Sequence, residues 1–286
     1  MEAKVLNGTE LAKKIKENLK REIEELKAKN IHTGLAVVIV GDDPASRIYV
    51  DLKKKDCAEI GIESYEYALD AKTTEEELIN LIHKLNKDPK VSAILVQSPV
   101  PKHINEDNVI FAIDPNKDAD CFHPVNVGKL MTGKPEFMPC TPAGVMELLE
   151  ENGIEVAGKE CVVVGRSNIV GKPQAIMLLS KNGTVTVCHS KTKNLNEVCK
   201  RADILVAAVG KAEMIKADAV KPGAVVIDVG VTRLSNNKLA GDVEFSTVSQ
   251  IASAITKVTG GVGPMTRAIL MKNAVKAAKL QSEGRV

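Results

Sequence analysis

The stretch of residues 160–179 constrains the fold of this chain more than any other. Val162, Val163 and Val164 form an apolar run that predicts a buried strand, residues 165–171 predict a turn, and residues 172–180 predict a helix. Pro173 suits the first turn of that helix, where a missing N–H loses no hydrogen bond. A strand, turn and helix in this order present unpaired backbone N–H groups beside a helix N-terminus, where phosphate binds. The stretch therefore predicts the first unit of a dinucleotide-binding domain.

The turn differs from the G-x-G-x-x-G pattern of such domains. Arg166 and Ser167 stand where a second glycine would allow a pyrophosphate its closest approach. An ordinary strand-to-helix turn without a ligand is therefore an alternative that this stretch alone leaves open.

Length and composition indicate a folded protein of two domains. The chain has 286 residues, which exceeds the usual size of one domain. Hydrophobic residues make up 44% and charged residues 27%, as in ordinary globular proteins. The net charge is only +2, and no basic stripe interleaved with aromatic residues occurs. We therefore expect no nucleic-acid partner.

The sequence lacks the usual features of exported, membrane and metal-binding proteins. Residues 1–20 contain no apolar run typical of a signal peptide, and no run of about 18 apolar residues occurs that could span a bilayer. The six cysteines and five histidines are scattered, without C-x-x-C or H-E-x-x-H spacing. We expect a cytoplasmic enzyme with reduced, mostly buried thiols, no metal site and no membrane partner.

Helices and strands alternate along the first half of the chain. The pattern predicts strands at residues 35–40, 64–68 and 91–97, and helices at residues 9–30, 45–60 and 73–86. Thr73 and Glu76 have the spacing of a capping box at the start of the third helix. This alternation is typical of an α/β domain with a parallel sheet, whose ligands bind at the carboxyl ends of the strands.

Tyr49 and Lys53 are four residues apart on the second predicted helix and therefore share one face. The chain has three Tyr, four Phe and no Trp. A Tyr one turn from a Lys is thus a plausible platform for a planar ligand. The alternative is that residues 53–55, three consecutive lysines, form a solvated surface.

Further polar residues follow the third strand. Gln97 is the one long polar side chain at its end, before Pro99 and Pro101, although the prolines could simply terminate the strand. Asp118 and Asp120 lie two residues apart before a turn. Such a pair can perform acid–base chemistry, hold a metal or cap a turn, and capping a turn is the commonest of the three.

The second half begins with a predicted helix that ends near Gly153, with Thr141 as N-cap and Pro142 at the first helical position. Strands are predicted at residues 184–188, 204–208 and 224–228. The last two are followed by Gly210 and Gly230, where the backbone can approach a cofactor.

Two loops complete the second half. Ser190 and Lys191 follow the strand at 184–188, and no Asp or Glu stands there to bind ribose hydroxyls, so a 2′-phosphate is favoured. Residues 256–266 form a glycine-rich loop before a last predicted helix at 266–280.

Six short motifs together resemble one family, the bifunctional methylenetetrahydrofolate dehydrogenase/methenyltetrahydrofolate cyclohydrolase enzymes. They occur in the family's order and cover the chain nearly from end to end. The motifs are Tyr49-Val50-x-x-Lys53, Val96-Gln97-x-Pro99-x-Pro101, Lys117-Asp118-x-Asp120, Pro139-Cys140-Thr141-Pro142, Gly165-Arg166-Ser167-x-x-Val170-Gly171-x-Pro173 and Gly260-Gly261-Val262-Gly263-Pro264-Met265-Thr266.

The resemblance implies an α/β protein of two α/β domains with a cleft between them. Residues 1–138 would form a folate-binding catalytic domain, which the C-terminal helix at 264–286 rejoins, and residues 139–263 would form a Rossmann-type NADP-binding domain. A homodimer joined through the nucleotide-binding domains is also implied. The implied reactions are oxidation of 5,10-methylenetetrahydrofolate with NADP and hydrolysis of the methenyl product to 10-formyltetrahydrofolate.

The resemblance also implies residue roles. Lys53 would act as general base, with its pKa lowered by burial and a neighbouring ligand cation, and Gln97 would orient its amine. Tyr49 would stack on the folate, and Asp120 would accept hydrogen bonds from the pterin. The implied substrate-binding residues are these four together with Pro99, Gly260, Gly261 and Pro264. The implied cofactor-binding residues are Thr141, Gly165, Arg166, Ser167, Val170, Ser190, Lys191, Gly210, Gly230 and Val231.

The chain departs from the family pattern at three positions. Cys121 stands where the family usually has Gly, and Lys257 and Thr259 stand where it usually has Pro. These departures put folate affinity and loop rigidity in question. Two alternatives remain: another NADP-dependent dehydrogenase of the shikimate or amino-acid type, and a non-catalytic folate- or nucleotide-binding protein.

Overall fold

A computed structural model describes residues 2–284 and divides into two compact units. One unit comprises Lys14–Met138 and Arg267–Val286, and it contains strand β2, so we call it the β2 unit. The other comprises Met1–Lys13 and Pro139–Thr266, and we call it the β5 unit. The last two residues of the predicted C-terminal segment at 264–286 lie outside the described residues.

The β2 unit is built on a parallel sheet with strand order β3-β2-β4. Every residue of the central strand β2 is buried, because helices cover both of its faces. The strands are β2 (Gly34–Val40), β3 (Glu63–Leu69) and β4 (Ala93–Val96). The helices of this part of the chain are α2 (Pro44–Ile60), α3 (Glu75–Lys87), α4 (Glu106–Ala112) and α5 (Pro124–Met131), with parts of α1 (Gly8–Ala28) and α10 (Val262–Ser282).

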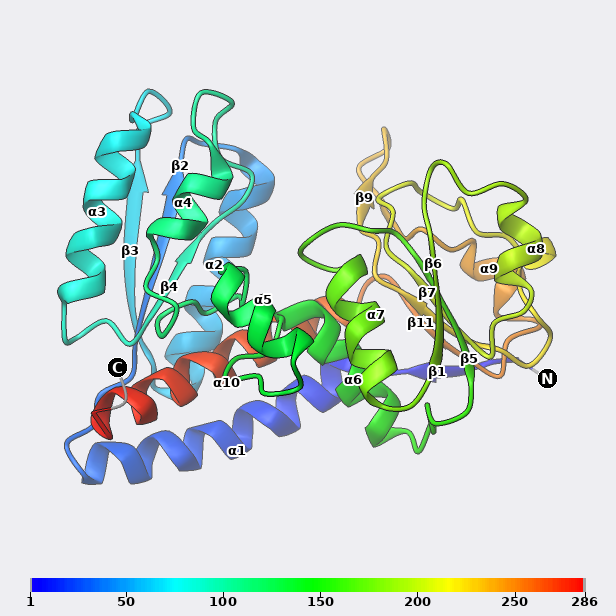
Figure 1. Cartoon of the computed structure of the whole chain (residues 1–286), viewed down its shortest axis with the longest axis horizontal. Coiled ribbons are helices and arrows are strands. Elements are labelled where there is room, and N and C mark those ends of the chain that lie inside the picture. The colour runs from blue at the N-terminus through cyan, green and yellow to red at the C-terminus, as the bar shows by residue number, and fades with distance from the viewer. Residues whose placement is uncertain (1, 285–286) are drawn as a thin grey trace. The chain divides into compact units, whose positions relative to one another are not determined.

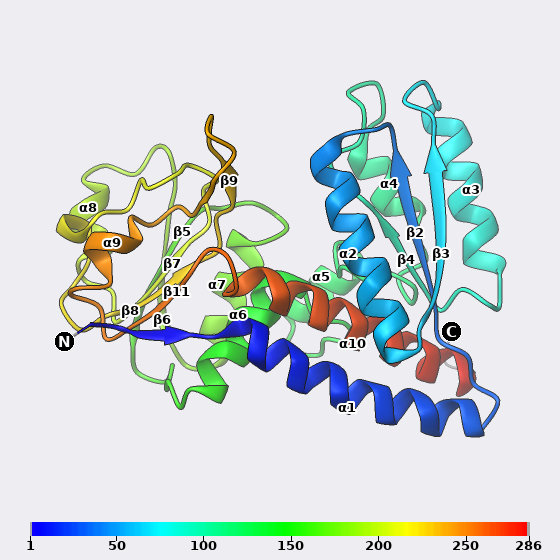
Figure 2. The ribbon, with the colours of Figure 1, turned by 180° about the vertical axis from the view of Figure 1, so that it is seen from behind.

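Helices α3 and α4 pack on one face of this sheet, and α2 lies on the other (Figures 1 and 2). Leu78 and Ile82 of α3 and Val109 of α4 form a buried cluster with alternate residues of β2, including Val38. The period of two in a strand explains why one set of β2 side chains meets α3 and α4 while the intervening set faces α2. The parallel sheet therefore places the ends of β2 and β4 at one edge of the unit.

Helix α3 begins one residue later than the sequence pattern predicts. Thr74, not Thr73, is the N-cap, and it exchanges hydrogen bonds with Glu77 in a complete capping box. The prediction of Thr73 with Glu76 was wrong because two adjacent threonines and three adjacent glutamates allow either register. The backbone conformation of Thr74, which is extended, makes it the residue that precedes the helix.

The β5 unit is also an α/β structure with a parallel sheet, in the strand order β1-β11-β8-β7-β5-β6. Its strands are β1 (Lys4–Leu6), β5 (Glu160–Val164), β6 (Thr184–Cys188), β7 (Ile204–Ala207), β8 (Val225–Asp228) and β11 (Ala254–Thr256). Its helical segments are α6 (Cys140–Glu151), α7 (Gly171–Ser180), α8 (Leu195–Cys199), η1 (Ala217–Ala219) and α9 (Phe245–Val248). A short hairpin joins β9 (Thr232–Arg233) to β10 (Leu239–Ala240).

Helices cover both faces of this sheet as well. Cys199, Ala219 and Val248, which belong to α8, η1 and α9, pack against one face in a single buried cluster with Val162 and Leu205. Helices α6 and α7 contact each other, and α7 contacts β5 and β6 (Figure 1). The predicted fold class of two α/β domains with parallel sheets is therefore confirmed.

Residues 1–13 lie in the β5 unit, whereas the sequence-based boundaries assign them to the first domain. Strand β1 pairs in parallel with β11, with Lys4 opposite Ala254 and Leu6 opposite Thr256. Three residues carry too weak a pattern to predict a strand, and a partner some 250 residues away is invisible to local patterns.

Candidate active site

The amine of Lys53 is held by the side chain of Gln97. Lys53 lies in the middle of α2, and Gln97 follows directly after β4. The Nζ of Lys53 donates a hydrogen bond to Oε1 of Gln97 at 2.9 Å. The Nε2 of Gln97 donates to the carbonyl oxygen of Ser98 at 2.6 Å, and its backbone N–H donates to Val38 at 2.8 Å. The backbone hydrogen bond to Val38 and the two side-chain hydrogen bonds thus orient the Gln97 amide toward the Lys53 amine.

Tyr49 lies one helical turn before Lys53 and is 42% exposed. A large aromatic ring that is half exposed on a helix can stack on a planar ligand without first displacing core residues. Pro99, two residues after Gln97, is also exposed and follows a cis peptide bond with Ser98. The β2 unit contains all four of these residues: Tyr49, Lys53, Gln97 and Pro99.

The motif at residues 117–120 separates into structural and pocket-lining residues. Lys117 is buried, and its Nζ donates to the carbonyl oxygens of Leu85 at 3.1 Å and Asp88 at 2.9 Å. Burial lowers the pKa of Lys117 below its ordinary value. Lys117 therefore fixes the loop after α3 and is turned away from a ligand role.

Asp118 is also buried and organises the following turn. Its carboxylate accepts hydrogen bonds from the backbone N–H groups of Phe122 at 3.1 Å and His123 at 2.9 Å, and from Nδ2 of Asn126 at 2.8 Å. Burial raises the pKa of Asp118. Asp118 therefore caps the turn, which is the commonest of the three roles that the sequence allowed.

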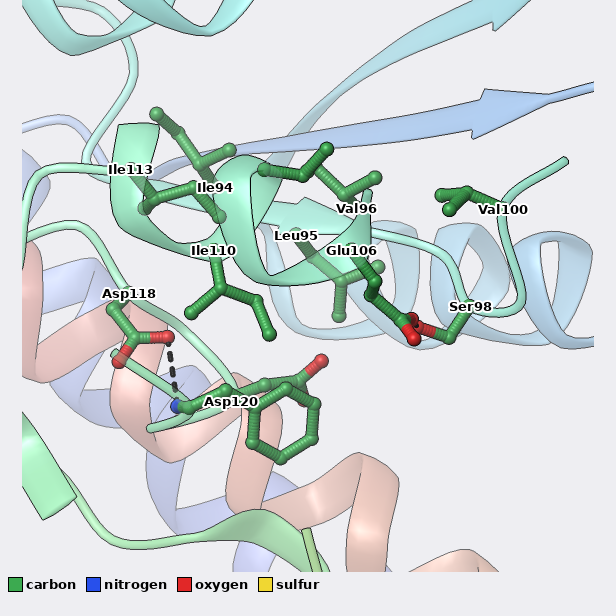
Figure 3. A pocket seen from close by; sticks show the side chains of 12 residues that line it. Ile94, Leu95, Val96, Ser98, Val100, Glu106, Ile110, Ile113, Asp118 and Asp120 are labelled. Carbon is green, nitrogen blue, oxygen red and sulfur yellow. Dashed lines mark hydrogen bonds between the residues drawn. The ribbon is translucent and has the colours of Figure 1, made fainter. Parts of the chain in front are cut away.

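Asp120 lines a pocket of about 410 Å³, part of which is open to solvent. Figure 3 shows apolar side chains of β4 and α4 on one side of this pocket and Asp118 and Asp120 on the other. The hydroxyl of Ser98 donates to the carboxylate of Glu106 at the edge. The lining residues are Ile94, Leu95, Val96, Ser98, Val100, Glu106, Val109, Ile110, Ile113, Asp118, Asp120 and Phe122. A mostly apolar wall with a few carboxylates suits a flat heterocycle that carries N–H donors.

Cys121 adopts a left-handed backbone conformation, with φ of 61°. Glycine adopts this region without steric cost, which explains why a glycine fits the position that Cys121 occupies here. The thiol donates to the carbonyl oxygen of Phe137 at 3.3 Å and is buried. The chain therefore keeps the backbone path of a glycine at this turn and adds a buried contact.

At the turn between β5 and α7, backbone segments pack too closely to leave room for side chains at Gly165 and Gly171. A Cβ added to Gly165 would lie 2.2 Å from the carbonyl oxygen of Ala208, and one added to Gly171 would lie 2.3 Å from the carbonyl oxygen of Gly165. Ser167 accepts hydrogen bonds on its Oγ from the N–H groups of Val170 at 3.1 Å and Gly171 at 3.2 Å. The hydroxyl of Ser167 therefore takes two of the N–H groups at the start of α7.

Exposed basic and hydroxyl side chains flank this turn. Arg166, Ser190 and Lys191 are all exposed, and among residues 2–284 none of them forms an ion pair with a carboxylate. The N–H of Lys191 donates to the His189 ring at 3.2 Å, which shapes the loop after β6. Two cations beside a helix N-terminus fit the phosphate groups of a dinucleotide.

The remaining predicted cofactor positions lie at other ends of the same sheet. Gly210 is exposed with φ of 68°, Gly230 is buried, and Val231 is 45% exposed. The N-cap of α6 is Pro139, so the predicted helix start, with Thr141 as N-cap and Pro142 at the first helical position, was wrong. The hydroxyl of Thr141 instead lies 2.9 Å from that of Thr266.

The glycine-rich loop before α10 belongs to the β5 unit. The carbonyl oxygen of Gly260, whose φ is 100°, accepts the N–H of Thr9 at 2.9 Å. Gly261 is buried, and Pro264 lies in the first turn of α10. These three residues are thus in a different unit from Lys53.

The cysteines take no part in these sites. All six are buried thiols, as predicted. Burial raises the pKa of Cys57 and Cys199 to about 12, so these thiols are protonated at neutral pH. Within the described residues, no group of three or more His, Cys, Asp or Glu is placed to hold a metal ion.

Two buried carboxylates of the β5 unit escaped the sequence analysis. Asp228 ends β8 and Asp242 follows β10, and both are at most 5% exposed. An Asp at the end of an apolar strand, before a glycine, was a visible signal for the first. Nothing local marks the second, because its importance depends on loops distant in sequence.

Comparison with known proteins shows the family. The tetrahydrofolate dehydrogenase/cyclohydrolase catalytic domain matches residues 6–120, and the NAD(P)-binding domain of the same family matches residues 139–282. The bifunctional protein FolD of Acetivibrio thermocellus is 72% identical over 283 residues, which cover 99% of each chain. No described helix has both the length and the apolar composition needed to cross a membrane.

Two solved structures agree with this match. The bifunctional FolD methylenetetrahydrofolate dehydrogenase/cyclohydrolase of Campylobacter jejuni is 48% identical with a TM-score of 0.96, covering 98% of this chain and 99% of that chain. The methylenetetrahydrofolate dehydrogenase-cyclohydrolase of Trypanosoma brucei, complexed with NADP cofactor and an inhibitor, is 38% identical with a TM-score of 0.95 and covers 99% of both chains. Because the matches span both units, the chain belongs to the tetrahydrofolate dehydrogenase/cyclohydrolase family.

Proposed function

We propose that this chain oxidises 5,10-methylenetetrahydrofolate with NADP and hydrolyses the methenyl product to 10-formyltetrahydrofolate. The observation that carries the proposal is the Lys53 amine, bonded to Gln97 next to Ser98 of the pocket, in a chain whose two parts match both domains of the family. A dehydrogenase of the shikimate type is not favoured, because the match includes the catalytic domain as well as the nucleotide-binding domain.

Lys53 is the proposed general base of the hydrolysis. The neutral amine takes a proton from the water that attacks the methenyl carbon, and the carbon–N5 bond then breaks as N5 gains a proton. Gln97 accepts one N–H of the amine, which restricts the directions that the lone pair of Lys53 can take. General acid–base catalysis of this kind typically contributes about 10² to 10⁴ in rate.

The proposed folate site combines stacking with hydrogen bonding. Tyr49 stacks on the ring system, and the Asp120 carboxylate accepts hydrogen bonds from the pterin N–H groups, which are the donors that a pocket carboxylate recognises. The apolar residues of β4 and α4 provide an apolar wall of the pocket. We further propose Pro99, Gly260, Gly261 and Pro264 as folate-binding residues, on the family motifs that contain them.

The proposed cofactor site lies in the β5 unit. Gly165, Arg166, Ser167 and Val170 form the turn before α7, where the positive end of the helix dipole suits the pyrophosphate. Ser190 and Lys191, together with the Arg166 side chain, suit the 2′-phosphate of NADP, and no carboxylate stands there to bind free ribose hydroxyls. The other proposed cofactor-binding residues are Thr141, Gly210, Gly230 and Val231. The nicotinamide, when bound, accepts the hydride, and the protein supplies orientation.

A spectroscopic assay tests the function directly. The purified protein is mixed with 5,10-methylenetetrahydrofolate and NADP, NADPH is followed by its fluorescence, and methenyltetrahydrofolate is followed by its absorbance. We expect NADPH to accumulate while the methenyl band stays low, because hydrolysis follows oxidation. A second experiment starts from methenyltetrahydrofolate without cofactor and measures its loss. Binding of both ligands without turnover would favour the non-catalytic alternative.

The proposed domains follow the two units and the family matches. We assign most of the folate-binding domain to residues 14–138, with the C-terminal part of α10, and NADP binding to the β5 unit, whose Gly260, Gly261 and Pro264 are proposed as additional folate contacts. A homodimer joined through the β5 units is also proposed. Its support is β6, an edge strand of the parallel sheet that offers unpaired backbone groups and an exposed Val187.

The cytoplasm is the proposed location. Six buried thiols without disulfides are typical of proteins that work in a reducing compartment. Export of the protein into an oxidising compartment in its active form would contradict this assignment.

A further inference from the structure

Two carboxylates lie buried at the carboxyl ends of β7 and β8. Asp242 has no exposed surface, and Asp228 is 5% exposed. Burial of an ionised carboxylate is costly unless hydrogen bonds replace its water. Within residues 2–284, no lysine or arginine pairs with either group, so backbone N–H groups do this instead.

Asp242 binds the loop that follows β7. Its Oδ2 accepts hydrogen bonds from the N–H groups of Val209 at 2.6 Å and Gly210 at 3.1 Å, and its Oδ1 accepts that of Lys211 at 2.8 Å. Three consecutive N–H groups therefore converge on one carboxylate. An exposed loop that includes a glycine with positive φ is held by a single side chain.

Asp228 connects the loop after β8 to the segment that contains Asp242. Its Oδ1 accepts the N–H groups of Gly230 at 3.1 Å and Asp242 at 2.9 Å, and its Oδ2 accepts that of Val243 at 3.0 Å. The two carboxylates thus act in series. Asp228 holds the backbone of Asp242, and Asp242 holds the loop after β7.

The glycines around these carboxylates leave no room for a side chain. A Cβ on Gly230 would lie 2.2 Å from Oδ1 of Asp242, and a Cβ on Gly241 would lie 1.8 Å from Oδ2 of Asp228. Gly230 was singled out as a residue that lets the backbone approach a cofactor. The structure gives it a different requirement, since its missing side chain makes space for the Asp242 carboxylate.

We propose that Asp228 and Asp242 are positioning residues that hold the loops after β7 and β8 in the conformation that binds the dinucleotide. This inference rests on the proposed function, because Gly210 and Val231 of these loops are proposed cofactor contacts. A loop that is already ordered loses less entropy when its ligand binds, so the carboxylates raise cofactor affinity without touching the cofactor.

The test compares Asp242→Asn and Asp228→Asn with a matched control, Asp203→Asn. Asp203 also accepts a backbone N–H, that of Glu160 at 2.9 Å, and it pairs with Lys221 at 2.7 Å. It precedes β7, whereas Asp228 and Asp242 lie beyond the carboxyl ends of the strands. A general loss of stability in this unit would therefore appear in all three variants, whereas a loss of loop order would appear in two.

NADPH affinity is measured by the fluorescence change on binding, together with KM for NADP and kcat. The cyclohydrolase rate of each preparation, measured without cofactor, reports the fraction of active protein. For Asp242→Asn, we expect the NADPH Kd and the KM for NADP to rise by about tenfold or more, and kcat to change less than these two constants. For Asp203→Asn, we expect both constants to change by less than about twofold. Equal affinity in all proteins would overturn the proposal.

Hydrogen–deuterium exchange of the unsubstituted protein provides a measurement that needs no variant. Without cofactor, we expect the amides of Val209, Gly210, Lys211 and Gly230 to exchange slowly although Gly210 and Lys211 lie on the surface. Rapid exchange that becomes slow only when NADP is added would mean that the cofactor orders the loops, and the inference would be wrong. A protein that neither oxidises nor hydrolyses folates would refute the proposed function, but slow exchange at these amides would still be measurable.

Discussion

Gln97 determines where the Lys53 amine points. Both ends of its side-chain amide are used, since Oε1 accepts from Lys53 and Nε2 donates to the carbonyl oxygen of Ser98. A rotated amide would turn Nε2 toward the Lys53 amine, where it would occupy the lone pair that a general base needs, and it would lose the bond to Ser98. Gln97, directly after β4, thus helps to orient the proposed general base.

We predict that Lys53→Met abolishes the cyclohydrolase and leaves NADP binding intact. The substitution removes the amine that takes the proton from water, and Met retains a similar apolar stem. The loss in rate should be about 10² to 10⁴ fold. The measurement is the decay of the methenyl band together with NADPH binding.

The matched control for this prediction is Lys54→Met. Lys54 is adjacent on α2 but pairs with Glu66 at 3.1 Å on the exposed surface. It should retain a cyclohydrolase rate within about twofold of the original, because an exposed ion pair contributes little. Hydrolysis at the original rate in Lys53→Met would refute the general-base role.

Arg166→Ala should reduce the preference for NADP over NAD. The guanidinium lies in the turn before α7, where it can bind a 2′-phosphate through charge-assisted hydrogen bonds of roughly 1.5 to 3 kcal/mol. The ratio of kcat/KM for the two cofactors should therefore fall by about tenfold to more than a hundredfold. Lys181→Ala, the same charge change at the other end of α7, is the control and should leave the ratio unchanged.

Asp228 should make the stability of the β5 unit depend on pH. Burial, with the neighbouring Asp242 charge, raises the pKa of Asp228 from 3.8 to about 6. The folded state therefore binds this proton more tightly than the unfolded state. The contribution to the free energy of unfolding is complete below the unfolded pKa and is lost as the pH rises through about 6.

The comparison of the original protein with Asp228→Asn tests this contribution. Asn does not titrate, so the stability of the original protein relative to the variant should fall by roughly 2 to 3 kcal/mol between about pH 4 and pH 7. Urea unfolding across this range measures the difference. A difference that is independent of pH would show that Asp228 has the same pKa in both states.

At the scale of elements, helix α2 is held in place at its C-terminal half. The carboxylate of Asp56 is buried, and it accepts Nζ of Lys16 from α1 at 2.9 Å and Nε of Arg267 from α10 at 2.6 Å. Asp56 lies three residues after Lys53, so it fixes the part of the helix that carries the proposed general base. Both partners belong to the same unit as α2.

We predict that Asp56→Asn destabilises the protein by about 1.5 to 3 kcal/mol, because two cations lose a charged acceptor that is shielded from water. The measurement is urea unfolding, with the cyclohydrolase rate as a second readout of α2. Asp51→Asn on the same helix is the control. Asp51 is exposed and, among the residues that the structure describes, pairs only with Arg47 across one turn, so its loss should be less than about 0.5 kcal/mol. Equal losses in both variants would contradict the assignment of this role to Asp56.

At the scale of the whole molecule, the proposed dimer depends on the β6 edge of the β5 unit. Val187 of β6 is 38% exposed, and Leu179 of α7, which packs beside β6, is 60% exposed. We predict that the protein is a dimer by light scattering and that Val187→Lys with Leu179→Lys makes it a monomer, because two charges would be desolvated in the interface.

The control for the dimer is Leu239→Lys. Leu239 is 39% exposed, as much as Val187, but it lies in the β9–β10 hairpin away from the sheet edge. It should leave the dimer intact. A monomeric original protein would rule out the dimer, and a dimer that persists in the double variant would place the interface elsewhere.

The sequence by itself determined the α/β class and most of the elements. Runs such as residues 35–40 and 162–164 are strands because their side chains are apolar throughout, a property that neighbours in sequence reveal. The Gly165–Gly171 turn was recognisable for the same local reason. The motifs with Lys53, Gln97 and Asp120 were also local, and the structure adds that Lys53 and Gln97 are in contact.

Only the tertiary structure decided which residues act together over long distances in the chain. Strand β1 exists because β11 provides its hydrogen-bond partners. The carboxylates of Asp228 and Asp242 have a role because loops 209–211, 230 and 241–243 converge on them. Their burial and their bonds follow from the packing of distant segments. A local pattern records the preferences of a residue but not the identity of its partners.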